Sequence, residues 1–112
     1  MKGQESTSIL KGKTITWTWT KGTFKDGKYE ISLLTNGHIH WKGLEGAEKG
    51  QEVIDKEYCV LEVNEDVCTL SWLESIGWTV TVTLNLKENR VYGFVSNDRE
   101  WHPLIGVIDS IQ

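Results

Sequence analysis

The chain has 112 residues, of which 38% are hydrophobic and 25% are charged, a size and composition that fit one globular domain. Its formal net charge of −4 argues against binding to nucleic acid or to an anionic membrane surface, and no apolar run is long enough to cross a bilayer. Because residues 1–8 are polar and lack the apolar stretch of a secretory signal, we expect a cytoplasmic protein.

The first strong pattern is an alternation of threonine with large apolar residues over positions 14–20. Ile15, Trp17 and Trp19 occupy every second position, which predicts a β-strand with one buried face and one face in water. After a glycine-containing turn, the alternating segment 28–34 predicts a second strand.

Six further short segments have strand patterns, separated by turn dipeptides such as Asn36-Gly37 and Ile76-Gly77. The charged, glycine-rich stretch 43–51 predicts a flexible loop over one end of the structure, with a single helical turn as the alternative. The six further strands are expected at 38–42, 56–63, 67–74, 78–86, 91–96 and 104–110. Eight short strands with short connections predict an all-β fold, a single eight-stranded antiparallel up-and-down barrel over residues 10–112 after a flexible tail at 1–9.

The two cysteines, Cys59 and Cys68, lie on adjacent predicted strands joined by a turn at 64–66. If these strands pair across the turn, Cys59 lies near Ser71 and Cys68 near Glu62, which is too far out of register for a disulfide. Two cysteines without a histidine at ligand spacing also make a poor zinc site. We therefore expect two buried free thiols.

Six tryptophans are many for so short a chain. Packing could account for about half of them, but their number also favours an aromatic-lined pocket for a flat apolar ligand. Tyrosine hydroxyl groups are expected to donate hydrogen bonds in the same lumen. The expected ligand-binding residues are Trp17, Trp19, Tyr29, Trp41, Tyr58, Trp72 and Tyr92.

Two groups of short motifs resemble known families. The segment Ser71-Trp72-Leu73-Glu74, followed by Gly77 and by the strand at 90–94, resembles the cofactor-free phenolic acid decarboxylases. The Gly-Lys-Thr opening within 12–17 and the Gly-x-x-x-Trp segment at 37–41 resemble the small MoaF-type calycin domains. Both resemblances imply a lipocalin-like (calycin) barrel with its site in the lumen and with no metal or organic cofactor. The likeness to the decarboxylases also suggests a homodimer.

The phenolic acid decarboxylases use a glutamate, an arginine and two tyrosines near the lumen. By this resemblance Glu74 matches the family glutamate, but no tyrosine stands at 22–24, where the tyrosine pair falls. The arginine falls in the segment 46–51, where Lys49 is the only basic residue, and lysine cannot make the planar two-pronged contact of arginine. The resemblance therefore supports the fold better than the decarboxylation of phenolic acids.

Glu74 shares the strand parity of Trp72, which points its side chain toward the interior near one rim. A carboxyl group in apolar surroundings has a raised pKa and can act as a general acid or base. The alternative is a solvated glutamate at the end of a strand. His40 is a candidate catalytic partner of Glu74, since a histidine and a carboxyl group form a competent acid–base pair.

His38 and His40 share one face of a predicted strand, a spacing that can begin a metal site. Only Glu30 or His102 could add a third ligand, so we expect no metal and interpret the histidines as outward or pocket-lining polar groups. Ser71 lies in a strand without a nucleophile elbow and has no evident His–Asp partners, which argues against a hydrolase triad.

Three functions remain open from the sequence. The leading hypothesis is a binding protein that holds a small aromatic or apolar metabolite in the barrel, with Glu74 at its polar end. The alternative is a cofactor-independent lyase or isomerase that uses Glu74 as acid–base group. The third is an interaction protein whose lumen is filled by its own side chains.

Overall fold

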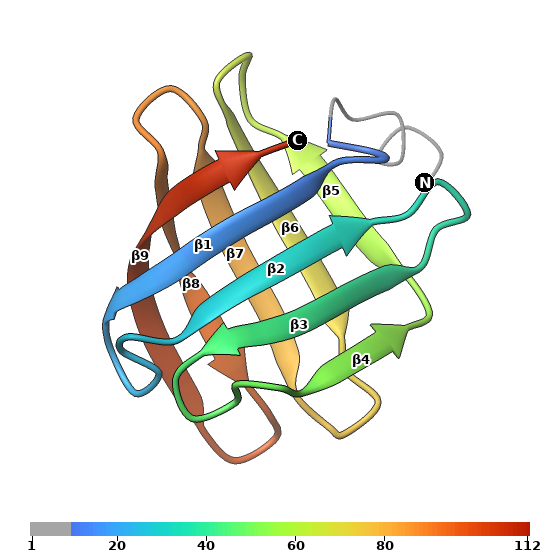
Figure 1. The fold of residues 1–112 in the computed structure, drawn as a ribbon. Helices are drawn as coiled ribbons and strands as arrows, with labels where there is room; N and C mark the ends of the chain where they lie inside the picture. Colours follow the sequence, from blue (N-terminus) through green and yellow to red (C-terminus); the bar gives the residue numbers. More distant parts are fainter. Residues whose placement is uncertain (1–9) are drawn as a thin grey trace.

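The computed structural model describes residues 10–112, which form nine β-strands (Figure 1). No helix in this range could span a membrane. The predicted tail at 1–9 lies outside the described residues. The strands are β1 (Thr14–Lys21), β2 (Lys28–Leu33), β3 (Ile39–Glu45), β4 (Glu52–Asp55), β5 (Tyr58–Glu62), β6 (Val67–Leu73), β7 (Thr79–Asn85), β8 (Arg90–Ser96) and β9 (Trp101–Ile111).

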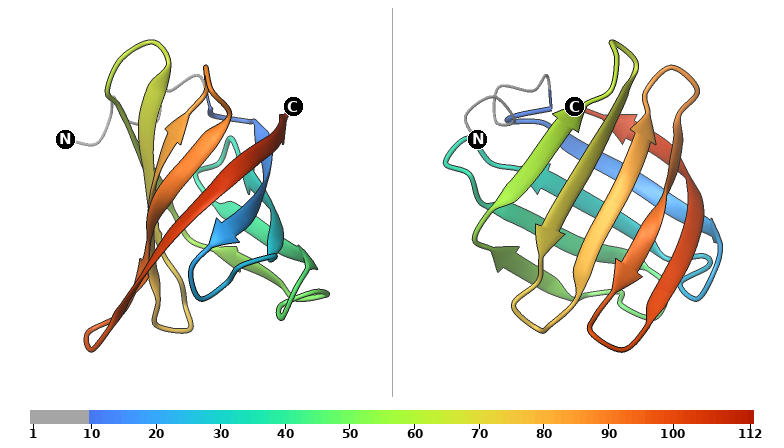
Figure 2. Two further views of the ribbon diagram at one scale, coloured as in Figure 1. Left: turned by 90° about the vertical axis from the view of Figure 1, so that its left-hand side faces the viewer. Right: turned by 180° about the vertical axis from the view of Figure 1, so that it is seen from behind.

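All nine strands belong to one antiparallel sheet, in the order β4-β3-β2-β1-β9-β8-β7-β6-β5. Strands that follow one another in the chain are neighbours in the sheet, with the exception of β4 and β5, which form its two edges. The first strand, β1, also pairs with the last strand, β9. The sheet curls until β1–β4 lie across from β5–β8, with β9 bending from one side to the other (Figure 1, Figure 2). The predicted all-β antiparallel barrel is therefore confirmed, as a half-barrel that is open between β4 and β5.

The ninth strand, β4, corrects the predicted number of eight. It has four residues, Glu52–Asp55, and within residues 10–112 it pairs only with β3, where Val53 faces Trp41. An edge strand of this length with mostly exposed side chains is too short to show an alternating pattern. β3 also runs on to Glu45, so the predicted loop at 43–51 begins later than expected.

The predicted parity of β1 is confirmed, since Ile15, Trp17 and Trp19 are buried and the intervening threonines are not. The register between β1 and β9 shifts twice, between Thr16 and Trp17 and again between Trp19 and Lys21. Such irregularities bend a strand and increase its twist. The two irregularities flank Trp17 and Trp19, the buried tryptophans of β1.

The cysteine register agrees with the sequence prediction. Cys59 faces Ser71 and Cys68 faces Glu62 across the β5–β6 pair, and both thiols are free. Cys68 is buried, and burial raises its pKa to about 11. The prediction that Cys59 is buried was wrong, because its strand parity places it on the outer face of the sheet.

The interior differs between the two ends of the half-barrel. Aliphatic side chains fill the end where β2 turns into β3 and β7 turns into β8. Each of these side chains is almost completely buried: Ile15, Leu33, Ile39, Leu70, Leu84 and Val91. The other end is aromatic, and the candidate site lies there.

Candidate functional site

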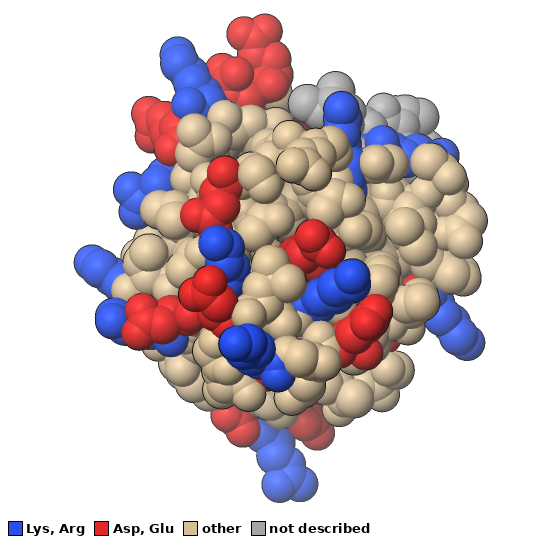
Figure 3. Space-filling model, in the orientation of Figure 1, with Lys and Arg blue, Asp and Glu red and all other residues tan. Residues whose placement is uncertain are grey.

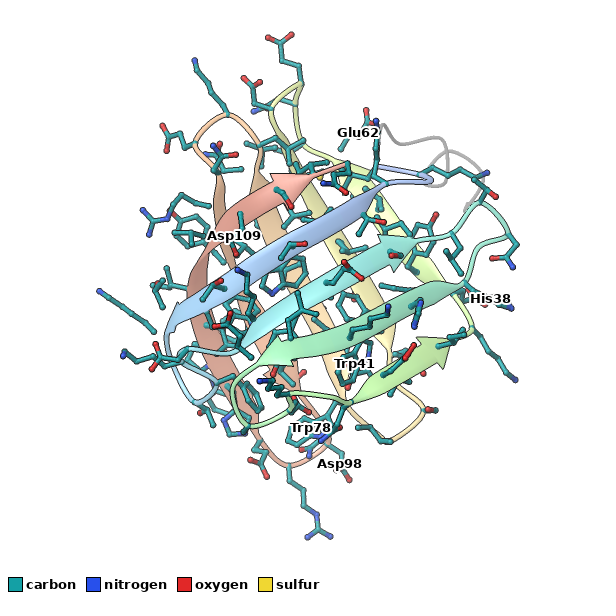
Figure 4. The ribbon with its side chains drawn as sticks, viewed as in Figure 1. His38, Trp41, Glu62, Trp78, Asp98 and Asp109 are labelled. Carbon is teal, nitrogen blue, oxygen red and sulfur yellow. The ribbon has the colours of Figure 1, made fainter. Side chains whose placement is uncertain are left out.

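The candidate site is a pocket of about 170 Å³ at the aromatic end of the half-barrel. The β1–β2, β3–β4 and β6–β7 connections lie at this end (Figure 1). Figure 4 shows Trp41 inside β3 and Trp78 near the lower turns. The lining residues are Trp17, Trp19, Phe24, Tyr29, Ile31, Trp41, Glu48, Trp72, Glu74, Trp78, Val80 and Val95.

Aromatic rings form most of the pocket wall and meet edge to face. The Trp17 and Trp19 ring centroids are 5.7 Å apart at an interplanar angle of 62°. Tyr29 and Trp41 form a second pair, 5.9 Å apart at 65°. Strand parity places these side chains inside, because β1, β2 and β3 each turn every second residue toward the lumen. Rings at such angles form walls that face in different directions.

Two of the lining tryptophans, Trp17 and Trp41, have a buried indole N–H group without a hydrogen-bond partner among the described residues. The indole of Trp72 interacts with Glu74, which acts against the rise in the pKa of that carboxyl group. A buried donor that finds no acceptor carries a free-energy cost, so such groups usually have a partner. Because these nitrogen atoms are closed off from the pocket space, the accessible wall of the pocket is mainly apolar.

Glu48 enters the pocket from the β3–β4 connection and accepts a hydrogen bond from the Tyr29 hydroxyl group. Burial, and secondarily Glu48, raise the pKa of Tyr29 above its ordinary value, so this phenol stays protonated. The sequence predicted a loop at one end of the barrel but gave no sign that a side chain of this loop turns inward. Glu48 is thus a pocket residue that sequence reasoning missed.

Two glycines hold the β3–β4 connection against its neighbours. A Cβ atom on Gly43 would lie 2.0 Å from the Glu48 carbonyl oxygen. Gly46 has a φ of +94°, and a Cβ atom there would lie 2.8 Å from Gly27 Cα in the β1–β2 connection. Only glycine permits these approaches. The two connections can therefore pack together and bring Glu48 over Tyr29.

Glu74 lines the pocket, on the parity that the sequence predicted from Trp72. Burial raises its pKa to about 7, and the nearby carboxylates of Asp55 and Glu48 add to the shift. Asp55 at the end of β4 is buried; its Oδ1 accepts a hydrogen bond of 2.9 Å from Ser75 N, and its Oδ2 has no partner among the described residues. A carboxyl group with this pKa can give or take a proton near neutral pH.

His40 lies away from this carboxyl group. Its side chain is on the opposite face of β3 from Trp41, and its Nε2 lies 3.0 Å from Glu52 Oε1. The predicted His40–Glu74 pair was therefore wrong, because alternate residues of one strand point to opposite faces. His38 Nδ1 lies 2.8 Å from the Lys56 carbonyl oxygen, at the right-hand side of Figure 4.

No group of three potential metal ligands occurs within residues 10–112. His102, one of the candidate third ligands, lies 2.7 Å from Glu100 and contacts Thr23 and Trp78. Ser71 forms a hydrogen bond with the Thr81 hydroxyl group on the outer face of the sheet.

Two of the predicted ligand-binding tyrosines do not line the pocket. The Tyr58 hydroxyl group donates to the Leu34 carbonyl oxygen at 3.1 Å. Tyr92 is 39% exposed on the outer face, with the Arg90 guanidinium 5.5 Å from its ring centroid. The structure does bring together the other predicted residues: Trp17, Trp19, Tyr29, Trp41, Trp72 and Glu74. Phe24 joins them from the β1–β2 connection, where period-two patterns define no side-chain direction. Trp78 joins them just before β7, on the parity that it shares with Val80 in the strand predicted at 78–86.

Comparison with known proteins identifies a family and solved structures of the same fold. The MoaF-like family model matches residues 12–109. No curated protein matches the chain. A crystal structure described as a "putative beta-lactamase" from Burkholderia vietnamiensis superposes with a TM-score of 0.77 over 94% of this chain and 95% of that one, at 17% sequence identity. At this identity the likeness shows a shared fold.

Proposed function

This chain belongs to the MoaF-like family, and we propose that it is a binding protein that holds a small aromatic or apolar molecule in the aromatic end of its half-barrel. The observation that carries the proposal is the pocket itself, which concentrates five tryptophans, Phe24 and Tyr29 around one space. Concave, mostly apolar pockets with a few polar groups are the usual sites for small ligands.

The pocket volume limits the size of the ligand. An apolar cavity of about 150 Å³ holds one benzene molecule. A space of about 170 Å³ therefore suits a single ring with a short substituent.

Titration of intrinsic tryptophan fluorescence with single-ring phenols, phenolic acids, amines and indole tests this proposal. A saturable change in emission with at least one compound is expected, because five of the six tryptophans line the pocket. Trp72→Phe should reduce the amplitude of the change. Trp101→Phe is the matched control, since Trp101 is 69% exposed and does not line the pocket. An unchanged spectrum with every compound would count against a ligand-binding function.

An enzymatic function is the second candidate, and Glu74 is the observation that favours it. A carboxyl group with a pKa of about 7 beside an aromatic pocket has the properties of a general acid or base. Product analysis of each titration mixture tests this candidate. Glu74→Gln should abolish turnover if the protein is an enzyme, and should only weaken affinity if it is a binding protein.

The name of the Burkholderia protein does not lead us to propose β-lactam hydrolysis here. The described pocket-lining residues include no serine, cysteine, lysine or histidine that could act as a nucleophile or as its base. The phenolic acid decarboxylase reaction also lacks support, because no arginine lines the pocket to hold a carboxylate substrate.

A further inference from the structure

On the basis of the proposed function, we infer that the ligand is a small organic ammonium ion. Its charged head would lie beside Glu74 and Glu48, and its apolar part would lie among the tryptophan rings. Both carboxyl groups belong to the described lining of one pocket, which contains no lysine, arginine or histidine.

The negative charges of the pocket have no ion-pair partner among the described residues. The ion pairs among these residues join Lys25 to Asp26, His40 to Glu52, Lys42 to Glu30 and His102 to Glu100. None of them includes Glu48, Glu74 or Asp55.

Buried carboxyl groups that lack a cation are costly, because low-dielectric surroundings disfavour the charged form. Asp55, the last residue of β4, shows this most clearly: it is 3% exposed, it lies beside the pocket without lining it, and its Oδ2 has no partner among the described residues. A bound cation would supply the missing positive charge next to Glu74, whose backbone neighbour Ser75 already contacts Asp55.

The aromatic walls favour the same ligand. The face of a tryptophan or tyrosine ring carries negative potential and attracts a cation, and rings set at angles to one another can surround an ammonium head. The Trp17–Trp19 and Tyr29–Trp41 pairs provide such rings, at interplanar angles of 62° and 65°. An aromatic cage with acidic residues therefore favours an ammonium ion over a neutral molecule of the same shape.

The same charges disfavour an anionic ligand. A carboxylate in this pocket would face Glu48, Glu74 and the nearby Asp55 without an arginine or lysine to offset the repulsion. The preference is thus opposite to that of a pocket built for phenolic acids.

Three compounds of nearly equal size separate the ligand classes: benzylammonium, benzyl alcohol and benzoate. Affinities are measured for the full chain at pH 8 by tryptophan fluorescence and by calorimetry. We expect benzylammonium to bind at least tenfold more tightly than benzyl alcohol, and benzoate to bind most weakly.

Two variants, each of which removes one negative charge, show whether the preference for benzylammonium depends on the pocket. Glu74→Gln should reduce the preference for benzylammonium over benzyl alcohol to threefold or less. Glu88→Gln is the matched control, because Glu88 is exposed in the β7–β8 turn at the opposite end of the half-barrel, and it should keep the full preference. Thermal unfolding of both variants shows whether they are folded.

The outcomes separate this inference from the proposed function. If benzyl alcohol or benzoate binds as tightly as benzylammonium, the ammonium inference is overturned and the binding function stands. An equal loss of preference in both variants would also overturn it, because the effect would then come from overall charge. If none of the three compounds binds at millimolar concentration but another compound of the wider panel does, the ammonium inference fails and the binding function stands; if no compound of either set binds, both fail.

Discussion

The Glu74 carboxyl group keeps its proton up to a pH at which an exposed glutamate has lost it. Its pKa of about 7 results first from burial and then from Asp55 and Glu48. These groups come from β4 and from the β3–β4 connection, and Tyr29 of β2 is the further titratable group electrostatically coupled to Glu74. The shift has consequences for stability and for the neighbouring residues.

The first prediction concerns the pH dependence of stability. Between about pH 4.5 and 7 the unfolded chain loses the Glu74 proton while the folded chain keeps it, so the free energy of unfolding falls as pH rises. The contribution is fully present below pH 4.5 and is lost through pH 7, and its size is on the order of 2–3 kcal/mol.

Urea unfolding of the wild type and of Glu74→Gln from pH 4 to pH 8 measures this contribution. The wild-type curve should fall more steeply, and the variant should be the more stable protein at pH 8. Parallel curves would contradict the assigned shift.

The second prediction concerns Asp55→Asn. The asparagine keeps an oxygen for the hydrogen bond from Ser75 N but removes the negative charge next to Glu74. The pKa of Glu74 should therefore fall toward its ordinary value of 4.5. Carboxyl NMR titration of the variant measures it directly, and an unchanged value would exclude Asp55 as a cause.

At the scale of single residues, parity within a strand predicted much of the site. Trp17, Trp19 and Glu74 point inward as expected, because period two fixes faces once one buried residue is known. Glu48 was outside the reach of this reasoning, since its direction depends on how the β3–β4 connection folds back. His40 was misassigned because the side of β3 that faces the lumen was not known.

The β3–β4 connection is the element that completes the pocket. Gly43 N donates to the Gln51 carbonyl oxygen at 2.8 Å, and Gly50 N donates to the Gly43 carbonyl oxygen at 2.9 Å. These hydrogen bonds close the connection on itself. The closed form requires the close approach between Gly43 and the Glu48 backbone.

The third prediction follows from that approach. Gly43→Ala would place a Cβ atom 2.0 Å from the Glu48 carbonyl oxygen, so the connection must move and the Tyr29–Glu48 hydrogen bond should be lost. We expect a loss of about 2–4 kcal/mol in the free energy of unfolding and weaker ligand affinity.

Gly50→Ala is the control for this variant. Gly50 has a φ of +91°, but a Cβ atom added there would have no neighbour within 4 Å, so its substitution strains the backbone without a clash and should cost about 1 kcal/mol. Denaturant unfolding compares the two variants, and equal losses would show that the Gly43 approach is not the cause.

At the scale of elements, long alternating segments were predictable and short edges were not. Threonine alternation identified β1 and β7 because one face of each is buried and the other is in water. β4 escaped prediction because three of its four side chains are at least partly exposed and it pairs with one neighbour only. Its position matters, since it brings Asp55 to Glu74.

At the scale of the whole molecule, the two ends of the interior differ in composition and in packing. Aliphatic packing at one end stabilises the sheet, while the aromatic end encloses the pocket. The hypothesis of a lumen filled by its own side chains thus describes one half of the interior. Sequence patterns could not locate this division, because it depends on which strand ends lie together after the sheet curls.

The outer surface is also divided. Acidic and basic side chains are interspersed over the outer face of β1–β4 (Figure 3), where Lys42 lies 3.9 Å from Glu30. The outer face of β6–β9 is uncharged along two complete cross-strand rows. These rows are Leu73-Thr79-Ser96-Trp101 and Ser71-Thr81-Phe94-Pro103.

The fourth prediction is that this uncharged face carries the homodimer expected from the sequence. Leu73, Phe94 and Trp101 are 72%, 48% and 69% exposed, and two copies with a net charge of −4 can meet there without opposing like charges. Sedimentation of the wild type at increasing concentration should show a dimer, and Phe94→Lys should shift it at least tenfold toward monomer. Ile54→Lys, at a 60% exposed position on β4, should leave the equilibrium unchanged. A wild type that stays monomeric at several hundred micromolar would show that this face does not pair with its own copy.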